Sequence, residues 1–231
     1  MRRLAVFDID GTLTETNAVD DECYLRAVGD ILNLDPAALD WTDAPHITDA
    51  ALLDWLAERN DRTPVNDATR QAVIDRFLEH LENASRTSRH RFRAVAGACE
   101  VFAELRQGGW HIAIATGGWE RSARFKLKLA GLDVSEVPLA SATDAPTRTE
   151  IMELAVRRAS FDNFPFERIV SIADGTWDVR AATELDWPFV GIASGDRAAE
   201  LRRLGATTIL PNFADTMMFC AALDAAEVPH P

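Results

Sequence analysis

Short apolar runs alternate with amphipathic segments along most of the chain. The short runs are rich in β-branched and aromatic residues, end in small or polar residues, and span 4–9, 111–115, 137–140, 168–172, 189–192 and 207–210. Segments with helical apolar spacing lie between most of them, at 99–107, 121–130, 149–159, 179–185 and 197–204. The first pattern is typical of strands and the second of helices. Their alternation predicts an α/β fold with a parallel sheet covered by helices on both faces.

Residues 15–94 interrupt this alternation, because they contain no convincing strand pattern. Their apolar spacing predicts helices over 20–32, 48–60 and 67–83, with Asn66 as the N-cap of the last. A stretch of about 80 residues without a strand is too long for a simple crossover between two strands. We therefore expect an inserted all-helical cap domain over 15–94, and an α/β core formed by residues 1–14 and 95–231.

The composition is that of a globular protein with a strongly acidic balance. The chain has 231 residues, of which 47% are hydrophobic, and its formal net charge is −13 with a sequence pI near 4.8. This charge repels nucleic acid and anionic lipid, so neither is an expected partner. An anionic substrate must instead be attracted by a local cationic site.

No segment predicts a membrane span or a disulfide framework. Every apolar run is shorter than the ~20 residues that a span needs, and the run after Arg2 and Arg3 is too short for the apolar region of a signal peptide. Cys23, Cys99 and Cys220 show no C-x-x-C spacing. We expect a soluble, cytoplasmic protein with reduced thiols, and the sequence leaves its oligomeric state open.

Polar side chains follow three of the predicted strands at the point where each strand ends. Asp8 and Asp10 follow the first strand, and Thr116 follows the strand at 111–115. Asp174 and Asp178 follow the strand at 168–172. Because the carboxyl ends of parallel strands meet at one edge of the sheet, we expect these five side chains to converge there.

Converging carboxylates repel one another unless a cation lies between them. An oxygen-only set of ligands, without histidine or cysteine, favours Mg²⁺ over zinc. Thr116 is followed by Gly117, Gly118 and a predicted helix, which together present a hydroxyl and backbone N–H groups to an anion. The pattern predicts a phosphate group bound beside Mg²⁺.

These motifs resemble those of a known family. DIDGT at 8–12, the strand that ends in Thr116, and ADGTWD at 173–178 are similar, in this order, to motifs I, II and IV of the haloacid dehalogenase-like (HAD) superfamily of phosphohydrolases. The resemblance covers 1–14 and 95–231, and the helical insert lies where this superfamily carries a C1-type cap. It implies a Rossmann-like core and points to the phosphatase branch that includes phosphoglycolate phosphatase and β-phosphoglucomutase-like proteins.

The resemblance implies covalent catalysis by a carboxylate. Asp8 corresponds to the nucleophile that forms an aspartyl-phosphate. Asp10 corresponds to the acid/base that protonates the leaving oxygen and then activates water. Thr116 and the Gly117 amide correspond to the groups that hold the phosphoryl oxygens.

The same resemblance implies a set of magnesium ligands. These are the Asp8 side chain, the Asp10 backbone carbonyl and Asp174. Asp178 is expected to be a further ligand or to orient one. The alternative for Asp178 is a structural role, because an acid in the first turn stabilises a helix.

Motif III, where the family places a lysine or less often an arginine, departs from the pattern. The only lysines, Lys126 and Lys128, lie too early, on the helix after motif II. Arg148 lies at the start of the helix that precedes motif IV, at roughly the right interval, and we expect it to replace the lysine. An arginine grips phosphate in a bidentate manner, so the replacement is chemically sound. The alternative is a surface arginine at a helix start.

Two further residues are candidates for substrate contacts. Trp119 follows the phosphate loop directly, where it either lines the substrate pocket or packs between helix and loop. His46, in WTDAPHITD at 41–49, either contacts the leaving group or is a surface histidine ahead of a capped helix. Thr48 and Asp49 are better explained as N-cap and first-turn residues.

The expected function is that of a Mg²⁺-dependent phosphatase for a small phosphorylated metabolite. Dehalogenation does not need the second acid, Asp10, and the phosphonatase branch needs a cap lysine that 15–94 lacks. A phosphosugar mutase of the same superfamily and a non-catalytic binding or regulatory protein on this fold remain alternatives. The sequence does not identify the substrate.

Overall fold

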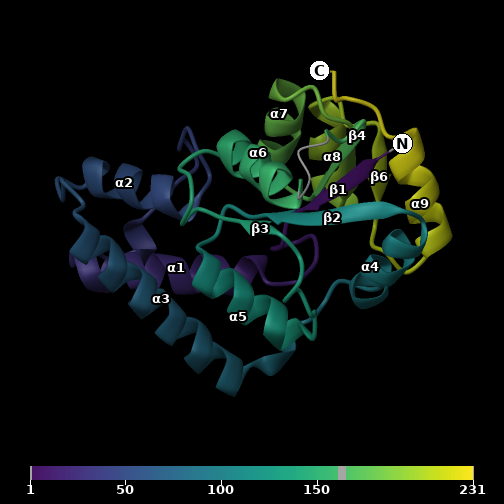
Figure 1. The fold of residues 1–231 in the computed structure, drawn as a ribbon. Helices are drawn as coiled ribbons and strands as arrows, with labels where there is room; N and C mark the ends of the chain where they lie inside the picture. Colours follow the sequence, from purple (N-terminus) through teal and green to yellow (C-terminus); the bar gives the residue numbers. More distant parts are fainter. Residues whose placement is uncertain (1, 161–164, 231) are drawn as a thin grey trace.

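The structure is a computed structural model and describes residues 2–160 and 165–230. Its centre is a six-stranded parallel sheet in the order β3-β2-β1-β4-β5-β6 (Figure 1). The strands are β1 (Arg3–Phe7), β2 (Trp110–Ala115), β3 (Leu139–Ala140), β4 (Arg168–Ala173), β5 (Phe189–Ile192) and β6 (Thr208–Leu210). The predicted α/β fold with a parallel sheet is confirmed.

The helices outside residues 15–94 cover both faces of the sheet (Figure 1). They are α4 (Ala98–Gln107), α5 (Glu120–Ala130), α6 (Arg148–Ala159), α7 (Thr176–Glu184), α8 (Gly195–Arg203) and α9 (Thr216–Ala225). Side chains alternate along β1: Ala5 and Phe7 join one buried apolar cluster, with α4 and α9, whereas Leu4 and Val6 join another, with α6. Burial on both faces explains why the β1 sequence is almost continuously apolar.

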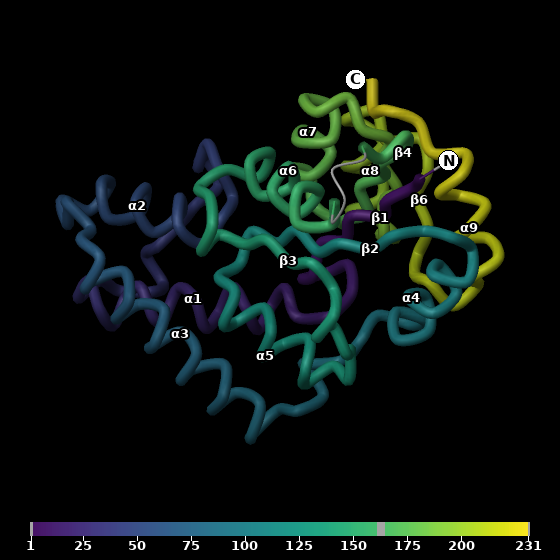
Figure 2. Tube along the Cα trace, in the orientation of Figure 1, coloured from purple at the N-terminus to yellow at the C-terminus, as the bar shows by residue number. Residues whose placement is uncertain are grey.

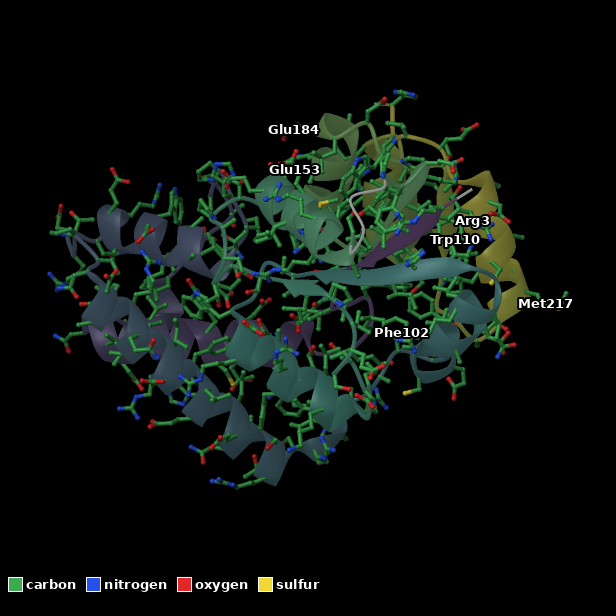
Figure 3. All side chains as sticks on the ribbon, in the orientation of Figure 1. Arg3, Phe102, Trp110, Glu153, Glu184 and Met217 are labelled. Atoms are coloured by element: carbon green, nitrogen blue, oxygen red, sulfur yellow. The ribbon has the colours of Figure 1, made fainter. Side chains whose placement is uncertain are left out.

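β1 lies in the middle of the sheet, between β2 and β4, as the trace in Figure 2 shows. Phe7 is paired with Ile114 of β2 and with Ile172 of β4, so the three strands end at nearly the same level. At the opposite end of the strands, the Arg3 guanidinium lies 4.7 Å from the centre of the Trp110 ring (Figure 3). This register brings the residues that follow the three strands to one edge.

Some observed boundaries differ from those predicted. β1 ends at Phe7 rather than at residue 9, because the chain turns there and the N–H groups of Leu13 and Thr14 both donate to the Ile9 carbonyl. The strand predicted over 137–140 is reduced to Leu139–Ala140, since Pro138 has no N–H to donate to a sheet. Helix α9 was not predicted from the apolar pattern.

Residues 15–94 are all described and contain no β-strand. They form α1 (Asn17–Leu32), α2 (Asp49–Arg59) and α3 (Asp67–Thr87), and two 3₁₀ turns, at Pro36–Ala38 and Arg89–Arg91. These helices lie to one side of the sheet in Figure 1. The chain leaves and returns at one place, where Glu15 N donates to Arg93 O at 2.8 Å and Val95 N donates to Leu13 O at 3.0 Å. The division into a core and a cap domain stays a prediction.

Candidate active site

The sheet edge carries the predicted residues at the positions that the strand order dictates. Asp8 directly follows β1, Thr116 directly follows β2 and Asp174 directly follows β4. Asp178 lies in the first turn of α7. Carboxylate oxygens of Asp8, Asp174 and Asp178 all lie within 4.8 Å of one another, in buried surroundings.

Arg148 completes this cluster from the start of α6. A capping box between Thr147 and Glu150 begins the helix, which makes Arg148 its first residue. Arg148 Nη2 donates to Asp8 Oδ1 at 2.6 Å, and Arg148 Nε donates to Asp178 Oδ1 at 2.5 Å. Only 8% of the residue is exposed, so Arg148 is not a surface arginine at a helix start.

The cluster holds more negative charge than Arg148 balances. Burial raises the pKa of Asp8 to about 8, against the opposing effect of the Arg148 guanidinium. Burial, followed by the charge of Asp178, raises the pKa of Asp174 to about 7. Arg197 Nε lies 3.9 Å from Asp174 Oδ2 and opposes this rise, but the pKa of Asp174 stays raised. A further cation is therefore needed if all three carboxylates are to be ionised at neutral pH.

The donor set fits Mg²⁺. Asp174 Oδ1 and Asp178 Oδ2 are buried and accept no hydrogen bond from the described residues. Two such carboxylate oxygens, beside a third acid, are the hard oxygen ligands that Mg²⁺ prefers. The Asp10 side chain does not belong to this group; it points instead to Thr16 and Lys126.

The loop after β2 lies against residues of the helical insert. Thr116 is buried, and its Oγ1 accepts from Gly118 N at 3.1 Å. A Cβ at Gly117 would lie 2.9 Å from Ile47 O and 3.5 Å from Arg148 Nη1, so a larger residue there requires a shift. Gly117 O accepts from Asp49 N at 2.8 Å. Gly117 thus lies between Arg148 and the start of α2.

Two candidate substrate contacts lie outside the cavity at this edge. Trp119 is 1% exposed and packs with Tyr24 and Phe77, with ring centroids 5.7 and 6.2 Å away. His46 is exposed to solvent and is not among the residues that line the cavity. Trp119 is therefore packed in the interior and does not line the cavity, and His46 lies on the surface.

The cavity itself lies between the sheet edge and residues 15–94. Of the predicted site residues, it is lined by Asp8, Asp10, Thr116, Gly117 and Arg148, with Asp174 and Asp178 outside it. The helical insert contributes Asn17, Asp20, Asp21, Tyr24, Trp41, Ile47, Thr48, Asp49 and Leu52. Thr48 is the N-cap of α2 as predicted, since its Oγ1 accepts from Ala51 N at 3.2 Å. Thr48 and Asp49 also line this cavity.

Lys126 is a buried charged residue that sequence reasoning set aside. It lies on α5 with 0% exposure, donates to Asp10 Oδ2 at 2.6 Å, and makes a second hydrogen bond to Asp20 Oδ1. The only feature of the sequence that indicates burial of Lys126 is its position on the apolar face of α5, with Ala123 and Leu127. Its described hydrogen bonds are to Asp10 and Asp20, not to Asp8 or Asp178.

The fold and the site define an α/β protein with a cluster of buried carboxylates at the carboxyl edge of its parallel sheet. Residues 3–186 match the family model described as haloacid dehalogenase-like hydrolase. The chain belongs to this family, which confirms the resemblance seen in its motifs. Comparison with curated protein sequences finds no match.

Solved structures of related fold cover nearly the whole chain. A hydrolase from Pseudomonas syringae has a TM-score of 0.72 at 22% identity, covering 94% of this chain and 97% of its own. CbbY from Rhodobacter sphaeroides, in complex with phosphate, has a TM-score of 0.70 at 20% identity, covering 97% of this chain and 100% of its own. β-Phosphoglucomutase from Clostridium difficile has a TM-score of 0.71 at 12% identity, covering 97% and 98%.

Proposed function

We propose that this hydrolase is a Mg²⁺-dependent phosphatase that acts on a small phosphomonoester through an aspartyl-phosphate on Asp8. The observation that carries the proposal is the buried contact of Asp8 with Arg148, beside Asp174 and Asp178. A carboxylate nucleophile, a guanidinium and a hard-cation site together match the needs of phosphoryl transfer.

The reaction divides into two displacements at phosphorus. In the first, a carboxylate oxygen of Asp8 attacks, the bond from phosphorus to the ester oxygen breaks, and a proton passes from Asp10 to the departing alcohol. In the second, water attacks the phosphoryl group, gives a proton to Asp10, and the bond from phosphorus to Asp8 breaks. Asp10 lines the cavity two residues beyond Asp8, which suits both transfers.

Separate groups hold the phosphoryl oxygens and the metal in this proposal. Thr116, the Gly117 amide and Arg148 bind the phosphoryl oxygens. Asp8, Asp174 and the Asp10 carbonyl hold Mg²⁺, and Asp178 orients Arg148 through Oδ1 while its Oδ2 faces the same cluster. When bound, Mg²⁺ neutralises negative charge on the carboxylates and on the phosphoryl group.

Residues 15–94 act in this proposal as a cap over a core formed by 1–14 and 95–231. Thr48 Oγ1 donates to Pro146 O at 2.7 Å, and Asp49 N donates to Gly117 O at 2.8 Å, which joins α2 to the loops of the site. A cap in this position excludes bulk water from the phosphoryl group. The proposed partner is a small phosphorylated metabolite. In the described part of the chain, no helix is both long and apolar enough to cross a membrane.

Phosphate release from a panel of small phosphomonoesters tests the proposal. The panel is run with Mg²⁺, with EDTA, and with the Asp8→Asn variant. We expect metal-dependent release that the variant lacks. Phosphate transfer between positions of a sugar phosphate, without net release, would instead indicate the mutase, and the absence of both reactions would favour a binding protein.

A further inference from the structure

Lys126 is a fully buried ammonium group that has no part in the chemistry proposed above. A buried charge is costly unless it is paired and hydrogen-bonded. Here two carboxylates pair with it, Asp10 from the loop after β1 and Asp20 from α1. Two acids near the start of the chain therefore meet α5, more than 100 residues further on, at one nitrogen atom.

The Asp10 carboxylate is held at both of its oxygens. Thr16 Oγ1 donates to Oδ1 at 2.5 Å, and Lys126 Nζ donates to Oδ2 at 2.6 Å. Asp10 still lines the cavity, with 19% of its side chain exposed. Charge-assisted hydrogen bonds are shorter and stronger than neutral ones, so the pair restricts rotation of the side chain.

Asp20 fixes the position of the lysine. Its side chain is 13% exposed, and its Oδ1 accepts a hydrogen bond from Nζ, which ties the lysine to α1 of the helical insert. A Cβ at Gly118 would lie 3.8 Å from Nζ, so the ammonium group lies close to the loop that follows β2. Lys126 is thus held between the helical insert and the loop after β2.

We propose that Lys126 is the positioning residue of the acid/base step: it holds Asp10 by Oδ2 at the cavity wall and is itself anchored by Asp20. The inference rests on the proposed phosphatase function. The step it serves is the first displacement, in which the phosphorus–oxygen ester bond breaks and the Asp10 proton passes to the leaving oxygen. Proton transfer needs the carboxyl within hydrogen-bond reach of that oxygen, and a small misplacement costs rate.

This role predicts a dependence on the leaving group. An alkyl alcohol departs slowly without a proton, whereas p-nitrophenolate departs readily as an anion. For Lys126→Met, kcat/KM for an alkyl phosphate should fall on the order of 10–100-fold, while kcat/KM for p-nitrophenyl phosphate stays within about threefold of the original. Asp10→Asn should show the same selectivity with a larger fall, on the order of 10²–10⁴-fold.

The test measures kcat/KM for sn-glycerol 3-phosphate, or for the best alkyl phosphate of the panel, and for p-nitrophenyl phosphate. Lys126→Met leaves Asp20 without its cation, so Lys126→Met with Asp20→Asn is measured as well, in case the single variant does not fold. Lys126→Arg is the conservative variant, expected to regain part of the alkyl phosphate activity. Lys128→Met, an exposed position on the same helix, is the matched control and should leave both substrates unaffected.

Selective loss on the alkyl phosphate, in Lys126→Met or in the double variant, supports the role. Equal loss on both substrates, or unchanged kinetics in a folded variant, would overturn it and leave Lys126 as a structural residue. If the unaltered protein hydrolyses neither substrate at any Mg²⁺ concentration, the phosphatase proposal itself fails. Failure of the phosphatase proposal is therefore distinguishable from failure of the Lys126 proposal, in which the variant hydrolyses both substrates as the original protein does.

Discussion

Asp8 and Arg148 lie 140 positions apart in the sequence, and Arg148 Nη2 donates to Asp8 Oδ1 at 2.6 Å in a buried contact. The contact exists because β1 lies at the centre of the sheet and because Thr147 caps α6 one residue before Arg148. Strand order and helix capping, acting together, bring a cation to the proposed nucleophile.

Replacing Arg148 tests whether this cation assists phosphoryl transfer. Arg148→Ala removes the bonds to Asp8 and Asp178, so kcat/KM for phosphate release should fall on the order of 10²–10³-fold. Arg148→Lys keeps the charge but not the fork of donors, and should be intermediate. Arg157→Ala, at an exposed position of the same helix, is the control. Unchanged release in Arg148→Ala would place the motif III cation elsewhere.

Asp8→Asn is expected to abolish turnover while it leaves the fold intact. The change is nearly isosteric, and the amide oxygen still accepts from Arg148, but an amide is not a competent nucleophile. The loss should be at least on the order of 10³-fold. Steady-state phosphate release, together with circular dichroism as a check on the fold, measures it, and substantial residual turnover in the folded variant would refute the nucleophile assignment.

Mg²⁺ should stabilise the folded protein. A ligand that binds only the folded state adds about 2.7 kcal/mol at a concentration of 100 times its Kd. We expect a rise in the unfolding temperature on titration with Mg²⁺, reversed by EDTA, and a much smaller rise for Asp174→Asn. An equal rise in that variant would show that the ion binds away from Asp174. Asp196→Asn, on α8, is a matched control.

Asp49 should make stability depend on pH. Burial raises its pKa from 3.8 to about 7, so the folded state holds more protons than the unfolded state between about pH 4 and pH 7. The contribution of Asp49 to the unfolding free energy is therefore largest below about pH 4, falls as the pH rises, and is lost above about pH 7. Asn at this position still accepts from Trp119 N, as Asp49 Oδ2 does at 2.8 Å.

Thermal unfolding at a series of pH values compares Asp49→Asn with the original protein. The unfolding temperature of the variant, relative to that of the original, should increase between pH 4.5 and pH 8. A difference that is constant with pH would show that Asp49 is ionised in both states, paired with a cation.

The residues that sequence reasoning placed at the sheet edge are those whose position depends only on strand order. Asp8, Thr116 and Asp174 each directly follow a strand, and a parallel sheet allows only one edge for them. Arg148 was predicted from its interval before motif IV, and the structure brings it to Asp8. Their catalytic roles stay predictions.

Lys126 and its partner Asp20 were not predictable in the same way. Both lie inside helices, and their contact depends on how α5 packs against α1, which no local pattern determines. The same holds for Trp119, whose burial depends on Tyr24 and Phe77 of the insert. The predicted length of the edge strand β3 was too great because Pro138 has no N–H and limits the strand pairing that its apolar neighbours suggest.

The two lysines differ completely in their exposure to solvent. Lys126 is fully buried, whereas Lys128 is exposed, and the other 22 of the 24 basic residues in the sequence are arginines. An amine-reactive dye or resin therefore meets one lysine side chain on this protein, at the end of α5 and on the far side of the helix from the Asp10 contact. Covalent attachment through this side chain leaves the carboxylate cluster untouched.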